Sequence, residues 1–114
     1  MKFTIQVEKI RSYQTLVYKN GHRTFRKKDY IQYLDKAKKQ IEVTETFTGY
    51  TDINIKFYST TKRLGDLDNI TKPILDLLQE VQIITNDRNV KKLTLEKIFK
   101  TKTNYIEIEI KEAT

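Results

Sequence analysis

Four stretches of the chain are predicted to be β-strands, and in all but 90–99 hydrophobic and polar residues alternate, which is the pattern of half-buried strands. In the first stretch, Lys2–Val7, the residues Phe3, Ile5 and Val7 share one face. The other three stretches are 50–58, 90–99 and 105–110. Strands of this kind place one face against a core and leave the other in water, so the pattern predicts a sheet that is covered on one side.

Apolar residues recur at helical spacing in two further stretches. The first runs from Asp29 to about Ile41, and its stripe consists of Tyr30, Leu34, Ala37 and Ile41. The second lies within 69–81, and its stripe consists of Ile70, Ile74, Leu77, Leu78 and Val81. Because Pro73 has no N–H to donate, we expect regular turns to begin close to it, with residues 66–71 as a lead-in.

A hairpin is predicted between Ile10 and Lys28, because Asn20-Gly21 separates two runs that contain aromatic and aliphatic residues. Its arms carry the candidate nucleic-acid contacts Arg11, Lys19, Arg23, Arg26, Lys27 and Lys28, interleaved with Tyr13, Tyr18 and Phe25. Cations of this kind bind phosphates, and aromatic rings stack on unpaired bases. An ordinary charged hairpin whose rings pack on the sheet explains the pattern equally well.

The order of these elements predicts an α+β fold, in which a small mixed β-sheet has two helices packed on one face. The chain of 114 residues fits a single domain, residues 1–114, and its content of 38% hydrophobic and 32% charged residues is typical of a globular protein. It has no cysteine for disulfides or thiolate metal sites. No apolar run could span a membrane and no signal peptide is recognisable, so we expect a cytoplasmic protein without a membrane partner.

Positive charge is concentrated in the first third of the chain. Residues 1–40 hold eleven Lys and Arg against three Asp and Glu, a balance of +8, whereas residues 41–114 hold eleven against twelve, a balance of −1; together these give the net charge of +7. Such asymmetry is expected of a protein that binds nucleic-acid phosphates, although it also serves solubility.

Acidic residues with the spacing of a metal site lie between Gly65 and Asp87. Asp66 and Asp68 point the same way if the chain there is extended, and Asp68 can also cap the following helix. Lys72 lies one helical turn beyond Asp68. A helix of about 18 Å followed by an extended return of about 20 Å permits Asp87 to approach the pair. Carboxylates that meet at one point need a hard cation between them, and Mg²⁺ prefers oxygen ligands of this type.

Two further cations precede these acids in the same loop. Lys62 and Arg63 could hold a substrate backbone beside the metal, or they could merely offset the carboxylates. Each aspartate also has an ordinary explanation, with Asp68 as a helix cap and the other two in turns.

The motif D-L-D-N-x-x-K at Asp66–Lys72, an apolar helix that contains Asp76, and the later Asn86-Asp87 resemble the RusA family of Holliday-junction resolvases. The resemblance covers about twenty-five residues, and the flanking strands agree only in pattern. It implies the catalytic residues Asp66, Asp68, Lys72 and Asp87, with Mg²⁺ bound by Asp66, Asp68 and Asp87, and it places Asn69 at the motif asparagine. The chain lacks the Pro-Pro-Ser-x-Asn type of motif that the family often has near the N-terminus. It also has Asn86 where the family often has a first Asp, which leaves Asp87 as the candidate third acid.

The resemblance implies an endodeoxyribonuclease that depends on Mg²⁺, with Mn²⁺ as a substitute, and that resolves four-way DNA junctions in recombination and repair. Paired symmetric nicks need two acidic sets, so a homodimer is expected. Small lysine-rich resolvases of this kind resemble those of prophages. The competing hypotheses are a non-catalytic basic DNA-binding module, and a phosphodiesterase that acts on RNA or flaps.

Overall fold

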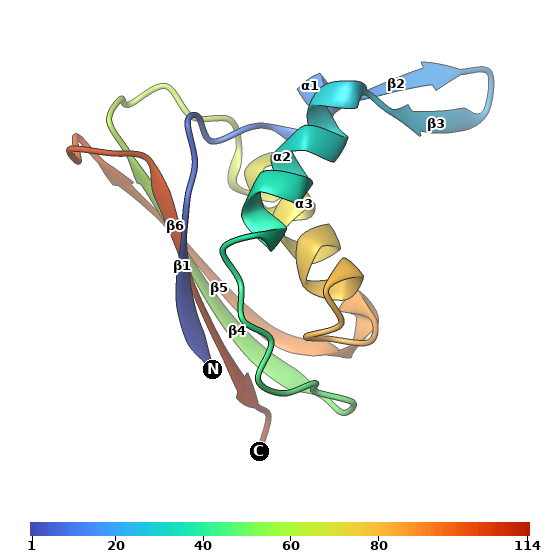
Figure 1. Cartoon of the computed structure of the whole chain (residues 1–114), viewed down its shortest axis with the longest axis vertical. Coiled ribbons are helices and arrows are strands. Elements are labelled where there is room, and N and C mark those ends of the chain that lie inside the picture. The colour runs from blue at the N-terminus through green and yellow to red at the C-terminus, as the bar shows by residue number, and fades with distance from the viewer.

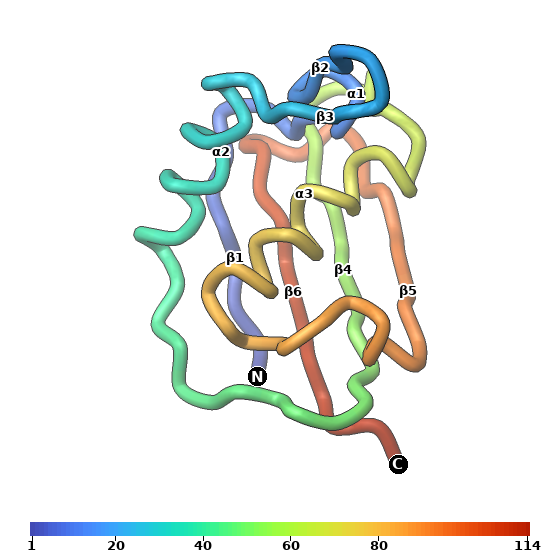
Figure 2. Tube along the Cα trace, turned by 90° about the vertical axis from the view of Figure 1, so that its right-hand side faces the viewer, coloured from blue at the N-terminus to red at the C-terminus, as the bar shows by residue number.

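The predicted strands form one mixed sheet in the computed structural model, which describes all 114 residues (Figure 1). Its strands are β1 (Lys2–Gln6), β4 (Thr51–Ser59), β5 (Val90–Phe99) and β6 (Tyr105–Glu112). They are arranged in the order β1-β6-β4-β5 (Figure 2). Neighbours are antiparallel except for β4 and β5, which run parallel because the connection between them crosses over the sheet as a helix.

The main helices α2 (Lys28–Lys38) and α3 (Leu67–Glu80) lie on the same side of this sheet (Figure 1). The predicted α+β architecture with two helices on one face is therefore confirmed. A further helix, α1 (Tyr13–Leu16), is only four residues long, too short for a periodic pattern to reveal it. None of the helices is long and apolar enough to cross a membrane.

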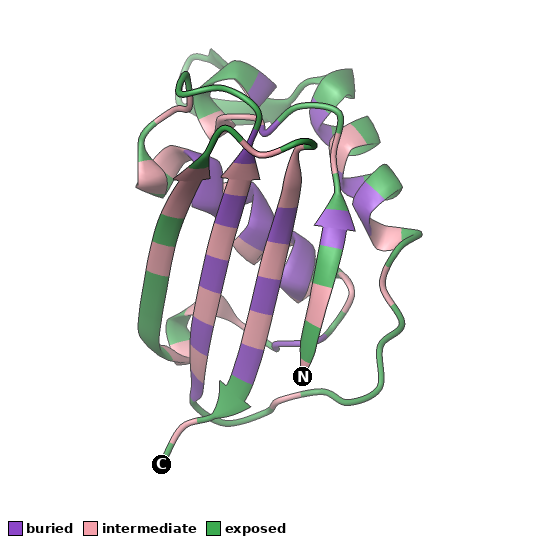
Figure 3. Cartoon of the chain, turned by 90° about the vertical axis from the view of Figure 1, so that its left-hand side faces the viewer, coloured by how far each residue is buried: buried purple, intermediate pink, exposed green.

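The core lies between α2, α3 and the sheet, and the alternation of the strands determines which residues enter it. Along β4, Ile53, Ile55 and Phe57 are buried under the helices. The residues between them are half-buried on the opposite face, so that β4 and β6 appear striped in Figure 3. Glu96 belongs to this helix-free face, because it pairs with Lys56, and it is thereby separated from α3 by the sheet.

Helix α3 begins six residues earlier than the position of Pro73 suggested. Leu67 is its first residue, and the Ile70 amide donates to the Asp66 carbonyl at 3.0 Å, which closes the first turn. Pro73 lies inside the helix, where it forfeits one backbone hydrogen bond. The expectation of a non-helical lead-in was wrong because Ile70 is fully buried, and a helical first turn is what carries it into the core.

The predicted hairpin is confirmed as β2 (Val17–Asn20) and β3 (Arg23–Arg26), which form a separate two-stranded sheet. Gly21 lies in the turn with φ of +65°, a conformation that glycine adopts without strain. The hairpin projects from the end of the molecule at which α3 begins (Figures 1 and 2). Tyr18 and Phe25 stack on each other and stay exposed, so the alternative in which these rings pack on the main sheet was wrong.

Burial of α3 predicts a clear contrast between two truncations. Leu77→Ala removes a side chain with no exposed surface and should lower the free energy of unfolding by about 2–5 kcal/mol. Ile31→Ala on α2 removes a side chain that is 51% exposed and should change it by only about 0.5 kcal/mol. Urea denaturation measures the free energy of unfolding of both variants. An equal decrease in the two would contradict the burial of this face of α3 against the sheet.

Candidate active site

The junction between the loop after β4 and helix α3 presents the first two aspartates. Asp66 is the residue before the helix, with φ of −61° and ψ of 148°, and its side chain caps no amide. Asp68 lies inside the first turn, so the prediction that Asp68 caps the helix was wrong. Because Asp66 is extended and Asp68 is helical, the two carboxylates do not share a face of one extended segment.

Both carboxylates are exposed, and neither takes part in a salt bridge. The free amides of the first helical turn carry partial positive charge, which stabilises carboxylates at this position. The neighbouring Asn69 also lies in this turn and is half-buried. The junction therefore presents carboxylate oxygens that a cation or a phosphate-bound ion can reach.

Gly65 holds this junction against the start of α1. A Cβ atom built on Gly65 would lie 2.1 Å from Ser12 Oγ and 3.3 Å from Ser12 Cβ, so only glycine allows the two segments to approach this closely. α1 also contacts α3 directly. The position of Asp66 thus depends on the segment that leads into the hairpin.

Asp87 approaches α3 from the other end of the sheet. It opens the short 3-10 helix η1 (Asp87–Asn89), which contacts α3 and leads into β5. Since β5 runs parallel to β4 and its first residue Val90 pairs with Thr51, the chain enters β5 where β4 begins. Asp66 and Asp68, in contrast, follow the end of β4. Asp87 lies near enough to Lys72 for its carboxylate to help raise the pKa of Lys72.

The structure contains no group of three or more His, Cys, Asp or Glu side chains that could hold a metal ion. Asp66, Asp68 and Asp87 therefore do not form such a group within this chain, and their joint binding of one ion stays a prediction. The donors nevertheless fit Mg²⁺ in their chemistry, since all are carboxylates without a salt-bridge partner. Mg²⁺ commonly needs only one or two protein carboxylates, with phosphate oxygens and waters as the other ligands.

Lys72 is held in place by two side chains. Its Nζ donates to Asp76 Oδ1 at 3.0 Å and lies 5.9 Å from the centre of the Tyr13 ring. Partial burial alone would lower the pKa of Lys72, but the Asp76 carboxylate more than offsets this, and the pKa is raised. Lys72 is thus a cation that is paired with Asp76 one helical turn beyond the acidic junction.

The structure divides the predicted DNA-contacting residues into two groups. Three of them have partners within the chain: Arg11 pairs with Asp29 at 3.5 Å, Arg26 with Glu80 at 2.9 Å, and Lys27 Nζ donates to the Thr15 carbonyl at 3.2 Å. The others are exposed, and none takes part in a salt bridge; they are Lys19, Arg23, Lys28, Lys62 and Arg63. Contact of either group with DNA stays a prediction.

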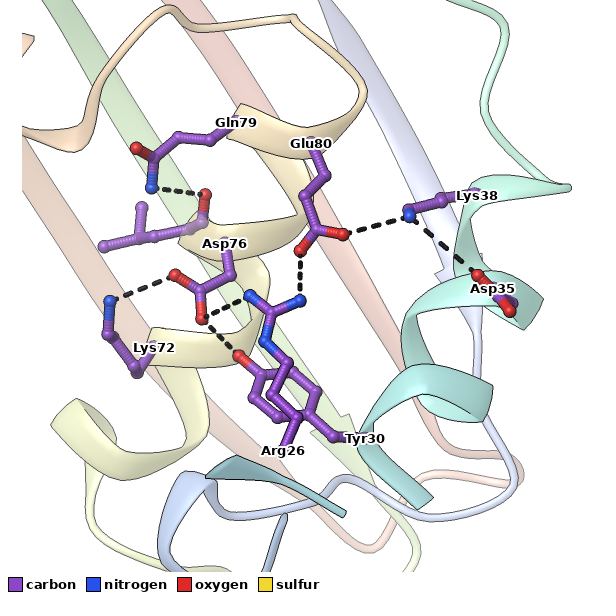
Figure 4. Close-up of polar contacts among 9 residues, drawn as sticks. Arg26, Tyr30, Asp35, Lys38, Lys72, Asp76, Gln79 and Glu80 are labelled. Atoms are coloured by element: carbon purple, nitrogen blue, oxygen red, sulfur yellow. Dashed lines mark hydrogen bonds and ion pairs between the residues drawn. The ribbon is translucent and has the colours of Figure 1, made fainter. Parts of the chain in front are cut away.

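Sequence reasoning missed a polar cluster behind Lys72 (Figure 4). Tyr30 on α2 donates its hydroxyl to Asp76 Oδ2, and Arg26 on β3 lies 3.6 Å from the same oxygen. Within this cluster, the spacing of four residues in the sequence indicated only the contact between Lys72 and Asp76. No local pattern indicated Tyr30, because its contact with Asp76 joins residues that are 46 positions apart.

Comparison with known proteins supplies one match. Residues 7–111 match the family model described as endodeoxyribonuclease RusA, which is nearly the whole chain and includes the acidic junction, Lys72 and Asp87. A search of curated proteins found no match.

The close approach at Gly65 predicts a specific defect and its repair. Gly65→Ala forces the α3 junction away from Ser12 and should cost about 1–3 kcal/mol of stability, measured by thermal unfolding. Adding Ser12→Gly removes the clashing atoms and should restore most of the loss. If the double variant is no more stable than Gly65→Ala, the contact with Ser12 is not the cause.

Proposed function

This chain belongs to the RusA family of endodeoxyribonucleases, and on that premise we propose that it cleaves four-way DNA junctions at the acidic junction of α3, with Mg²⁺. The single observation that carries the proposal is the match of residues 7–111 to this family, in a structure that leaves Asp66 and Asp68 exposed and without salt bridges. A bound Mg²⁺, or Mn²⁺ in its place, would lower the pKa of a water and stabilise charge on the phosphate.

In this proposal the aspartates bind the metal ion and Lys72 binds the DNA phosphate. Asp66 and Asp68 would bind the ion together with phosphate oxygens of the DNA, and Asp87 would be the third carboxylate of the set. Lys72 would bind and orient the scissile phosphate and offset the negative charge that develops on it. The i,i+4 pair with Asp76 supports this role, because it keeps the ammonium protonated and restricts its movement.

The hairpin supplies a surface suited to branched DNA. Tyr18 and Phe25 stack with their ring centres 5.4 Å apart and are 50% and 37% exposed. The two strands of the hairpin carry no acidic residue and contain the cations Lys19, Arg23 and Arg26. Since the hairpin projects at the end of the molecule where α3 begins, DNA bound there would extend toward the acidic junction (Figure 2).

Two symmetric nicks require two copies of the site, and each chain carries one acidic junction. We therefore propose that the active species is a homodimer, in which a two-fold axis relates the sites to the two strands that are cut. Light scattering of the purified chain, alone and with junction DNA, measures the number of copies.

The proposal predicts junction cleavage that depends on metal and on the acidic junction. In Mg²⁺ the chain should introduce paired nicks into a mobile four-way junction and leave a linear duplex of the same sequences intact. EDTA and Asp68→Asn should each reduce the rate by about a hundredfold or more, because removal of one electrostatic group from such a site has this effect. Asp52→Asn on the helix-free face of β4 should cut at the wild-type rate.

The alternatives give distinct outcomes in the same gel assay. Junction that is bound but never cut, in Mg²⁺ or in Mn²⁺, would make the chain a DNA-binding module. Equal cutting of flaps or RNA would keep the metal chemistry and overturn the junction as its substrate. A normal rate for Asp68→Asn would contradict the assignment of the site.

The exposed rings predict an effect on binding that is separate from cutting. Replacing Tyr18 and Phe25 by alanine removes stacking that is worth about 1–3 kcal/mol per base, so junction affinity should fall at least tenfold in a fluorescence anisotropy titration. Tyr50→Ala removes a ring that is 63% exposed beside β4 and should leave the affinity unchanged. An equal loss in both variants, or none in either, would contradict a role of the hairpin.

A further inference from the structure

Asp76 is a carboxylate with three partners, although only 12% of its side chain is exposed. One oxygen, Oδ1, accepts from Lys72 at 3.0 Å. The other, Oδ2, accepts from the Tyr30 hydroxyl and lies 3.6 Å from Arg26 (Figure 4). A mostly buried carboxylate is costly unless such partners satisfy both oxygens, so the arrangement fixes Asp76 in one orientation.

Tyr30 is the rigid member of this cluster. Its side chain is fully buried, its ring meets the Tyr13 ring edge-on at 6.0 Å, and Arg26 lies over its face at 4.7 Å. Burial, followed by the hydrogen bond to Asp76, raises the pKa of Tyr30, so the hydroxyl stays protonated and donates at all working pH values. The hydroxyl can therefore hold Asp76 independently of solvent.

The Lys72–Asp76 pair differs from an ordinary exposed salt bridge on a helix, because its acidic partner also contacts Tyr30 and Arg26. An exposed i,i+4 pair contributes little to stability, and the order of Lys before Asp is the less favourable one. In this chain the acidic partner is fixed from behind by residues of α2 and β3, so the flexible lysine is bound to a stationary acceptor. A lysine side chain loses rotamer entropy when it is fixed, and fixing it before the DNA binds removes that cost from the reaction.

We propose that Tyr30 and Asp76 are positioning residues, which act through Lys72 to hold its ammonium where the scissile phosphate binds. The proposal rests on the proposed function, because it assigns Tyr30 and Asp76 to the same site. Arg26 connects the cluster to the hairpin, since its guanidinium also binds Glu80, which in turn binds Lys38 at 3.0 Å. Arg26 is thus placed to secure the base of the hairpin against α3.

The test compares two tyrosines of the same helix. Tyr30→Phe removes only the hydroxyl that holds Asp76, and kcat for junction cleavage should fall on the order of tenfold, with KM for the junction unchanged within about twofold. Tyr33→Phe is the matched control: its hydroxyl accepts from the Arg11 amide at 3.4 Å and has no contact with the cluster, so this variant should cut as the wild type does. Thermal unfolding verifies that both variants are folded.

A double-variant cycle separates positioning from a general structural effect. In a Lys72→Gln background, Tyr30→Phe should cause no further loss in single-turnover cleavage, because the lysine through which Tyr30 acts is gone. A second tenfold loss in that background would show a structural effect and overturn the proposal. A wild-type kcat for folded Tyr30→Phe would overturn it as well and would leave the proposed function intact.

A measurement on the unaltered chain covers the case in which Tyr30→Phe does not fold. The NMR order parameter of the Lys72 ammonium should clearly exceed that of Lys19, an exposed lysine of the hairpin with no salt-bridge partner. Equal order parameters would overturn the proposal. If the wild-type chain cuts no junction at all, the proposed function fails and this inference fails with it.

Discussion

The structure depends on the burial of one face of α3 against β4 and β6. Ile70, Ile74 and Leu77 are almost completely buried there, and this burial is strong enough to keep the helix continuous through Pro73. The same packing determines which side chains of α3 face the solvent. Asp66 and Asp68 stay in solvent at the start of the helix, and Lys72 lies one turn further along. The chemistry of the site is thus a consequence of hydrophobic packing on the opposite side of one helix.

Charge is distributed in a way that matches this geometry. Acids that have partners hold the fold together: Asp76 and Glu80 bind the hairpin base through Arg26, and Asp29 binds Arg11. The motif acids, in contrast, have no salt-bridge partner within the chain. The hairpin, with its exposed cations, lies at the end of the molecule where α3 begins (Figure 2), and the exposed Lys62 and Arg63 lie in the loop that leads into α3. A strongly negative ligand can therefore approach the acids from a basic surface.

Local patterns in the sequence predicted the strands, the hairpin and the two main helices. The strands and main helices are long enough to show a repeat of hydrophobic positions, and the hairpin is marked by the turn residues Asn20-Gly21. They also predicted the acidic motif and Lys72. The start of α3 was misplaced because the preference of Pro73 is a local rule that burial of Ile70 overrides. The contact of Tyr30 with Asp76 was not predictable, since it follows from which distant elements pack together.

The central claim is that a metal ion binds at the α3 junction and lies between the motif acids and the DNA. The most direct test is NMR of the labelled chain with substoichiometric Mn²⁺, alone and with junction DNA, because Mn²⁺ broadens the amide signals closest to it. The account predicts selective broadening at residues 65–70 and at Asp87 that strengthens with DNA, and no effect at Glu107 and Glu109 of β6. Broadening centred on β6, or none at the α3 junction with DNA bound, would contradict it.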